Sequence, residues 1–189
     1  MNPIDAIIQR MIRFAADRRG NAIVEFGLIL PLLTFVFMGG LDVGQLVVAN
    51  LKVYNAASSM ADLVARDKTI SAATLTDLFG AASQVAQPFD LDTNGKVIIT
   101  SVSADVDNDP RLFWQSEQGS FSATSVVGTV IGDPATLPPT LQVDAQETII
   151  VSEVFFHFEP IFGLLNTGTT IYHSAYYRPR LGTLREIVP

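Results

Sequence analysis

A long apolar run near the N-terminus is the strongest pattern in this chain. The twenty residues from Ala22 to Leu41 contain one charged residue, Glu25. A helix rises about 1.5 Å per residue, so a helix of this length spans about 30 Å, the thickness of the hydrocarbon core of a bilayer. We therefore predict a transmembrane helix over residues 21–41.

The residues before this run form a basic leader over residues 1–20. Its apolar residues recur at helical spacing, and they are Ile4, Ile7, Ile8, Met11, Ile12 and Ala15. Arginines occupy the other faces of the same predicted helix. This pattern is typical of an amphipathic helix that lies on a membrane surface.

The helical pattern also continues beyond the apolar run. Leu46, Val53 or Tyr54, Ala57, Ala61 and Val64 keep a spacing of three to four residues. We therefore expect an amphipathic continuation of the helix over residues 42–68. Its apolar stripe needs a cover, either the chain's own sheet or a partner, and we interpret the stripe as a surface that pairs with another subunit.

Residues 69–189 have the pattern of an extracytoplasmic α+β domain. A short helix is predicted from Ala72 to Gln87, with Ser71 as its N-cap and Pro88 closing it. Strands are then predicted where β-branched and aromatic residues gather between turn signals, over Lys96–Val106, Phe121–Ile131, Glu147–Phe158 and Thr169–Tyr177. Consecutive strands without intervening helices indicate an antiparallel sheet. The predicted fold class is α+β, with a long N-terminal transmembrane helix extending into an antiparallel sheet domain that packs on its outer half.

Charge gives this arrangement an orientation. The formal net charge is −7, which argues against nucleic-acid binding, since that requires a basic face. Four arginines precede Asn21, whereas the first basic residue after the apolar run is Lys52. The positive-inside rule therefore predicts a cytoplasmic N-terminus and places the bulk of the chain on the outer side of the membrane. The chain has no cysteine, which excludes disulfides and thiol chemistry.

The junction between leader and apolar run carries a second signal. Arg18, Arg19 and Gly20 precede the run, and Glu25 follows Gly20 by five residues. A charge costs about 2.5–3.5 kcal/mol at the membrane centre and less near an interface. Either Glu25 reaches back to the cytoplasmic surface, or cleavage between Gly20 and Asn21 creates an amino group that pairs with it.

Three further residues of the apolar helix suggest structural roles. Pro31 removes a helical hydrogen bond, so we expect a kink there. Gly40 and Gly44 are four residues apart, the spacing of small residues that lets membrane helices pack closely. Small residues are also common in membrane helices for no such reason.

Candidate chemistry in the outer domain is sparse. Asp90, Asp92 and Asn94, followed by Gly95, match the opening of a calcium-binding loop, but the twelfth position is Ser101 instead of glutamate. A turn leading into a strand explains the same residues. We find no catalytic constellation and expect a protein that is not an enzyme and holds no cofactor, with Ca²⁺ as the open alternative.

The aromatic residues Phe113, Trp114, Tyr176 and Tyr177 allow two interpretations. They either anchor a partner surface or pack in the sheet's core. Core packing is the commoner use of such side chains, and we favour it.

Residues 18–66 resemble the TadE-like family, which comprises minor pilins or pseudopilins of the tight-adherence (Tad/Flp) pilus. The resemblance is carried by Gly20 to Phe26, by Leu28 to Leu33 around Pro31, by Gly39 to Gly44 and by the alanine-rich stretch Asn55–Arg66. It implies a membrane-anchored, non-enzymatic protein that assists or primes pilus assembly, with a place at the pilus tip as one option. The implied partners are a prepilin peptidase, pilus subunits, another TadE-like minor pilin and the inner-membrane assembly platform.

Two alternatives stay open beside the minor pilin. The first is an uncleaved, single-pass inner-membrane scaffold or binding protein of the same machinery. The second is a membrane-anchored hydrolase that uses the acidic loop containing Asp90, Asp92 and Asn94.

Overall fold

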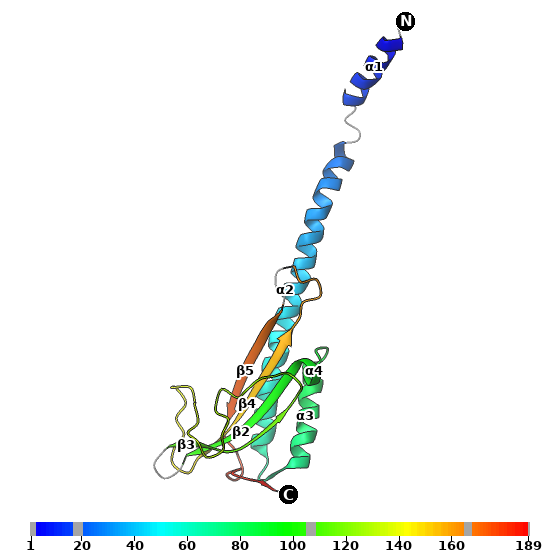
Figure 1. Cartoon of the computed structure of the whole chain (residues 1–189). Helices are drawn as coiled ribbons and strands as arrows, with labels where there is room; N and C mark the ends of the chain where they lie inside the picture. Colours follow the sequence, from blue (N-terminus) through cyan, green and yellow to red (C-terminus); the bar gives the residue numbers. More distant parts are fainter. Residues whose placement is uncertain (1–2, 17–20, 105–108, 165–167, 189) are drawn as a thin grey trace.

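A computed structural model describes residues 3–16, 21–104, 109–164 and 168–188. Helix α1 spans Pro3–Ala16, and the long helix α2 spans Asn21–Arg66. The N-terminal half of α2 extends away from the rest of the molecule, and its C-terminal half is packed into the β domain (Figure 1). The predicted continuation of the membrane helix is confirmed, and it ends at Arg66 instead of residue 68.

Three short elements follow α2 on the way to the sheet. Strand β1 (Ile70–Ser71) pairs in parallel with β6 (Ile187–Val188), which ties the end of the chain to the end of α2. Helix α3 spans Ala72–Ala86, and the Ser71 hydroxyl accepts a hydrogen bond from the backbone N–H of Thr74 at 3.1 Å. The predicted helix and its N-cap are therefore confirmed. A single helical turn, α4 (Leu91–Asn94), leads into the first long strand.

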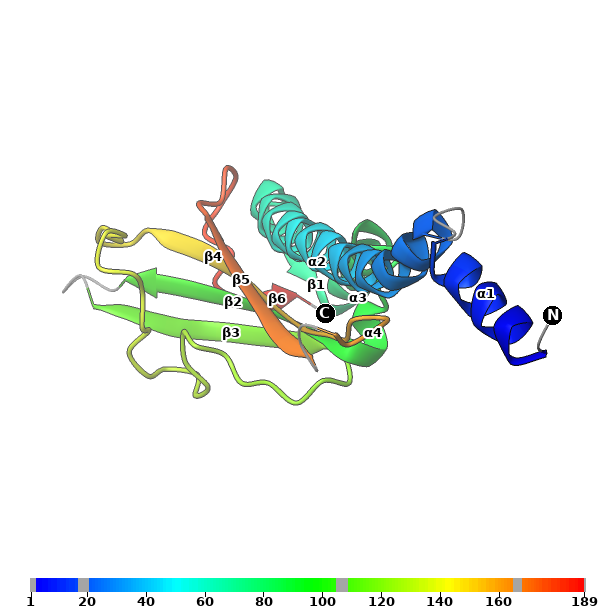
Figure 2. The same cartoon turned by 90° about the horizontal axis from the view of Figure 1, so that it is seen from above.

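Four antiparallel strands form the main sheet in the order β3-β2-β4-β5. They are β2 (Gly95–Ala104), β3 (Pro110–Gln118), β4 (Thr148–Phe158) and β5 (Thr169–Tyr177). Figure 2 shows α2 and α3 on the same side of this sheet. The predicted α+β class, with a long N-terminal helix and an antiparallel sheet, is confirmed.

The prediction of a strand over Phe121–Ile131 is wrong. Those residues belong to an irregular segment between β3 and β4, where Gly128 and Gly132 adopt φ values of +152° and +92°. Backbone at positive φ does not fit a ladder of L-residues. The strand that pairs with β2 is instead β3, which was not predicted because it begins at Pro110, a residue that sheets admit at the start of an edge strand.

The amphipathic stripe of α2 packs on the chain's own sheet, so its interpretation as a subunit-pairing surface is wrong. Val53, Ala57 and Val64 are at most 1% exposed and lie in one core with residues of α3, β2, β4 and β5. The sheet residues that face the helix in this core include Ile150, Val154 and Phe156 of β4 and Ile171 of β5. The sheet therefore supplies the cover that the stripe requires.

The opposite face of the sheet is covered by the segment between β3 and β4. Val127 and Val143 of that segment pack against Val102, Ile149 and Val151 in a second apolar cluster. Glu153, which is fully buried, holds the same segment through its carboxylate. That carboxylate accepts hydrogen bonds from the Ser125 hydroxyl, the Val126 N–H at 2.9 Å and the Tyr172 hydroxyl at 3.0 Å.

Candidate assembly helix and its flanks

The first part of α2 exposes apolar side chains on every face. From Ile23 to Phe37 its large apolar residues are at least 47% exposed, and only 6% of its most apolar 18-residue stretch is buried. The core helix of a soluble protein would be mostly buried. Among the residues that the structure describes, this is the one helix long and apolar enough to cross a membrane.

The predicted cleavage site lies at the first residue of this helix. Helix α1 ends at Ala16 and α2 begins at Asn21, while Gly20, Arg18 and Arg19 lie outside the described residues. Glu25 follows Asn21 by four residues, so the two occupy the same face of the helix on successive turns. Helical side chains tilt toward the N-terminus, so position 25 allows a carboxylate to reach back toward the start of α2.

Helix α2 continues through Pro31 without a break. The proline lacks an N–H group, which removes one bond to the carbonyl of Gly27. Thr34 adds a bond in the next turn, its hydroxyl donating to the Leu30 carbonyl at 2.9 Å. Side-chain bonds of this kind bend helices slightly. The kink at Pro31 stays a prediction.

Gly40 and Gly44 lie on an open face of α2. A side-chain carbon built at either position would meet no atom within 4 Å. Val47, Leu51 and Tyr54 continue this exposed face for several turns beyond the predicted span, each more than half exposed. Gly40 and Gly44 therefore lie on a part of α2 that is open to another helix, and they border the groove described below.

Asp42 is a functional feature that the sequence analysis missed. It directly follows the predicted span and is only 4% exposed. Its two carboxylate oxygens accept hydrogen bonds from the backbone N–H groups of Phe162 (3.0 Å) and Leu164 (3.3 Å). The loop between β4 and β5 is thus fastened to α2 at the end of its exposed part. The only sequence signal was an acidic residue directly after an apolar run.

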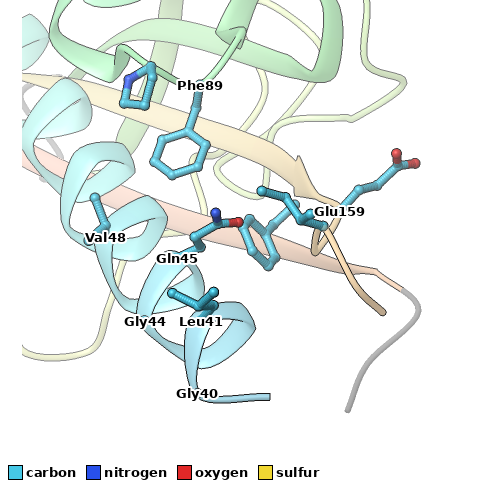
Figure 3. A pocket seen from close by; sticks show the side chains of 10 residues that line it. Gly40, Leu41, Gly44, Gln45, Val48, Phe89 and Glu159 are labelled. Carbon is cyan, nitrogen blue, oxygen red and sulfur yellow. The ribbon is translucent and has the colours of Figure 1, made fainter. Parts of the chain in front are cut away.

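An apolar groove of about 610 Å³ opens beside this junction. It lies between α2, the link from α3 to α4 and the β4–β5 loop, and its wall includes Gly40, Leu41, Gly44, Val48, Phe89 and Ile161. Figure 3 shows the ring of Phe89 directed toward the helix and the Glu159 carboxylate directed away from it. Two of the wall positions are glycines, which keep the groove open at the helix.

The residues of the predicted calcium loop lie in a helical turn and at the start of a strand. Leu91–Asn94 forms the helical turn α4, and Gly95 begins β2, so the remainder of such a loop is not formed. The Asp90 carboxylate caps α4 by accepting the Thr93 N–H at 3.0 Å, and this hydrogen bonding lowers the pKa of Asp90. Asp92 accepts a hydrogen bond from the Ser83 hydroxyl at 2.7 Å. Within the described ranges, no three His, Cys, Asp or Glu side chains gather in a group that could hold a metal ion.

The aromatic residues divide between core and helix contacts. Trp114 is 5% exposed, and its ring N–H donates to the Leu184 carbonyl at 2.8 Å, which fastens the C-terminal segment to the sheet. The Tyr177 hydroxyl lies 3.1 Å from that of Ser58 on α2. Core packing, the favoured interpretation, is confirmed for Trp114.

The predicted family resemblance is confirmed over part of the chain. Residues 20–62 match the family model described as TadE-like protein. None of the curated proteins and none of the solved structures compared with the chain matches it. The matched residues comprise Gly20 and all of α2 except its last turn, so the similarity lies in the helix and leaves the β domain without a relative in these comparisons.

Proposed function

We propose that this protein is a TadE-like minor pilin, or pseudopilin, of a tight-adherence (Flp-type) pilus, and that it assists or primes pilus assembly. The similarity to TadE-like proteins and the apolar N-terminal helix support an association with that pilus system through a membrane-anchored component. The proposal assigns no enzymatic activity and no cofactor. A place at the pilus tip is compatible with it.

The observation that carries the proposal is the extent of the family match. It begins at Gly20 and continues to Asp62, well beyond Leu41, where the predicted span ends. A match caused only by a generic apolar span would stop near Leu41. The matched segment contains both the exposed half of α2 and the half that packs on the sheet. It therefore supports a pilin-like design in which one helix serves as membrane anchor and as spine of the outer domain.

The proposed processing step is cleavage of the bond between Gly20 and Asn21 by a prepilin peptidase. The cut would leave a free amino group on the first residue of α2, one turn before Glu25. A carboxylate inside an apolar helix is stabilised when a positive partner lies within reach. The new amine, in the same chain or in a neighbouring subunit, provides that partner.

The proposed topology is a single pass through a bacterial inner membrane. The leader's arginines remain in the cytoplasm, and the β domain lies on the periplasmic side. After cleavage the helix enters the assembling pilus and its former lipid-facing surface packs against other subunits.

The proposed partners in assembly are pilus subunits and another TadE-like minor pilin. The part of α2 that contains Gly40 and Gly44 supports this, because nothing in the chain occupies the space beside the two glycines. Small residues let two helix backbones approach closely. The exposed apolar residues Val47 and Leu51 extend the same face toward the outer domain.

One observation favours the second candidate, an uncleaved inner-membrane scaffold. Helix α1 has exposed apolar side chains at Ile4, Ile7, Ile8 and Met11, which share one side of the helix. Such a helix binds a membrane surface and would serve a permanent anchor as well as a removable leader.

Gly20→Val in cells that carry the peptidase separates the two candidates. The minor-pilin proposal predicts loss of processing and loss of pili, because a bulky residue blocks close approach of the peptidase to the backbone. The matched control is Gly27→Val, which changes the same residue type inside the helix, where nothing lies within 4 Å. It should leave processing intact. Normal pili in the Gly20→Val strain would favour the scaffold.

A further inference from the structure

The tip of the β4–β5 loop is apolar and exposed. Ile161 is 69% exposed, Phe162 39% and Leu164 38%. Loop tips of soluble domains usually carry polar turn residues, and neighbouring exposed apolar side chains mark a contact surface. We therefore expect these three side chains to contact an apolar partner.

The position of the loop identifies that partner. In Figure 1 the loop lies at the end of the sheet nearest the exposed half of α2. Leu164 lines a second groove, of about 510 Å³, together with Phe35, Val36, Gly39, Gly40 and Val43 of α2. All of these helix residues except Val43 belong to the predicted span. Leu164 therefore lies at the height of helix residues that belong in the bilayer.

The depth follows from helix geometry. Phe35 precedes Asp42 by seven residues, about 10 Å along a helix axis. Since hydrocarbon and headgroup regions together measure about 40–45 Å, each headgroup layer is about 5–8 Å thick. Since the predicted span ends at Leu41, Asp42 lies where the hydrocarbon core meets the headgroup layer, and a side chain that reaches from Asp42 toward Phe35 enters the upper acyl chains.

The polar groups of the loop fit this position. The Asp42 carboxylate accepts hydrogen bonds from the N–H groups of Phe162 and Leu164. The Glu159 carboxylate is directed away from the helix (Figure 3) and lies 3.7 Å from the imidazole of His157. Both carboxylates thus have partners within the domain, while Ile161, Phe162 and Leu164 stay exposed.

From these observations we propose that Ile161, Phe162 and Leu164 insert into the outer leaflet of the membrane that α2 spans, and that lipid acyl chains fill the two grooves beside Gly40. Lipid is the occupant because the patch is continuous with the lipid-facing surface of α2. The domain then has two attachments to the bilayer, helix and loop, which fix its orientation on the surface. The proposal rests on insertion of α2 in a membrane and is independent of the proposed role in pilus assembly.

The test uses the full chain in nanodiscs of phosphatidylethanolamine and phosphatidylglycerol, with one chain per disc. Since the chain has no cysteine, Ile161→Cys and Leu164→Cys each give one labelling site for an environment-sensitive dye. The matched control is Val130→Cys, an exposed apolar position beside β3 at the other end of the sheet, where Gly132 bonds to Leu112. Quenching is measured with aqueous iodide and with lipids that carry a nitroxide near the top of the acyl chain.

The expected result is strong quenching of the dyes at positions 161 and 164 by the nitroxide lipid and a several-fold loss of iodide quenching relative to position 130. Equal iodide quenching at all three positions would overturn the proposal. So would protection that appears only in discs loaded with two chains, because the occupant would then be a second copy. Two independent positions, both exposed, keep the test valid if one label disturbs the fold.

Discussion

Asp42 offers the sharpest test of how α2 and the β4–β5 loop are joined. Its carboxylate accepts two backbone hydrogen bonds, from Phe162 and Leu164, at a site where the residue is only 4% exposed. Asp42→Ala leaves both N–H groups without this acceptor. A hydrogen bond to an ionised group contributes about 1.5–3 kcal/mol, and contributions that share one partner do not add fully. We expect the free energy of local opening of the loop to fall by about 3 kcal/mol, which is a factor of roughly 100 in the opening equilibrium.

Amide hydrogen exchange of the full chain in detergent micelles measures this opening. Exchange in a peptide that covers residues 159–164 should become roughly 100-fold faster in Asp42→Ala and less so in Asp42→Asn, which keeps one acceptor oxygen. The matched control is Asp62→Ala, on the same helix, whose partners Arg66 and Arg180 are more than half exposed. Exposed pairs contribute about 0–1 kcal/mol, and this control should leave exchange of the loop unchanged. If Asp42→Ala also leaves it unchanged, the loop is not held by Asp42 and the reasoning fails.

Three further predictions concern the β domain. Glu153→Ala removes the acceptor of three hydrogen bonds and should lower the free energy of unfolding in urea by about 2–4 kcal/mol. Glu153→Gln should cause a smaller loss. Equal urea midpoints for Glu153→Ala and the parent would show that these buried hydrogen bonds do not stabilise the domain. Burial, followed by the negative charge of Glu153, raises the pKa of Tyr172 above its usual 10.0. The protonated form of Tyr172 therefore contributes stability that is present below pH 10 and is lost as the pH rises above 10. Tyr172→Phe should flatten the stability profile above pH 10, and a profile as steep as the parent's would remove Tyr172 from this account. Ala57→Leu overpacks the helix–sheet core and should destabilise the domain by about 1–3 kcal/mol in thermal unfolding. Tyr54→Leu, at a position that is half exposed, should change the stability by no more than about 0.5 kcal/mol. An Ala57→Leu variant as stable as the parent would contradict the packing of α2 on its own sheet.

Local signals predicted most of the elements correctly. The apolar run and the spacing from Leu46 to Val64 define α2, and Ser71 marks the start of α3 through its side-chain cap. The alternation in β2, β4 and β5 was visible because these strands carry β-branched and aromatic residues. Strand β3 was missed and Phe121–Ile131 was assigned in its place, since the valines of that segment look strand-like while its glycines decide the backbone.

The contacts that position the β4–β5 loop and leave part of α2 exposed join residues far apart in the sequence. A local sequence pattern does not predict such contacts. Asp42 accepts hydrogen bonds from residues more than a hundred positions later, and Glu153 accepts one from Ser125 in the segment that covers the sheet. The same holds for the stripe of α2. Its amphipathic spacing shows that a cover is needed and leaves open a partner as well as the predicted sheet, and the packing of α2 on β4 and β5 shows that the sheet supplies it. The exposed face with Gly40 and Gly44 follows from that contact.

The mass of the mature protein tests the central claim most directly. The protein is purified from membranes and sheared pili of cells that carry the prepilin peptidase, and its intact mass and N-terminal sequence are measured. Cleavage after Gly20 predicts a chain that starts at Asn21 and has 189 − 20 = 169 residues. A protein that starts at Met1 in those cells would contradict processing, and the chain would then be an uncleaved anchor.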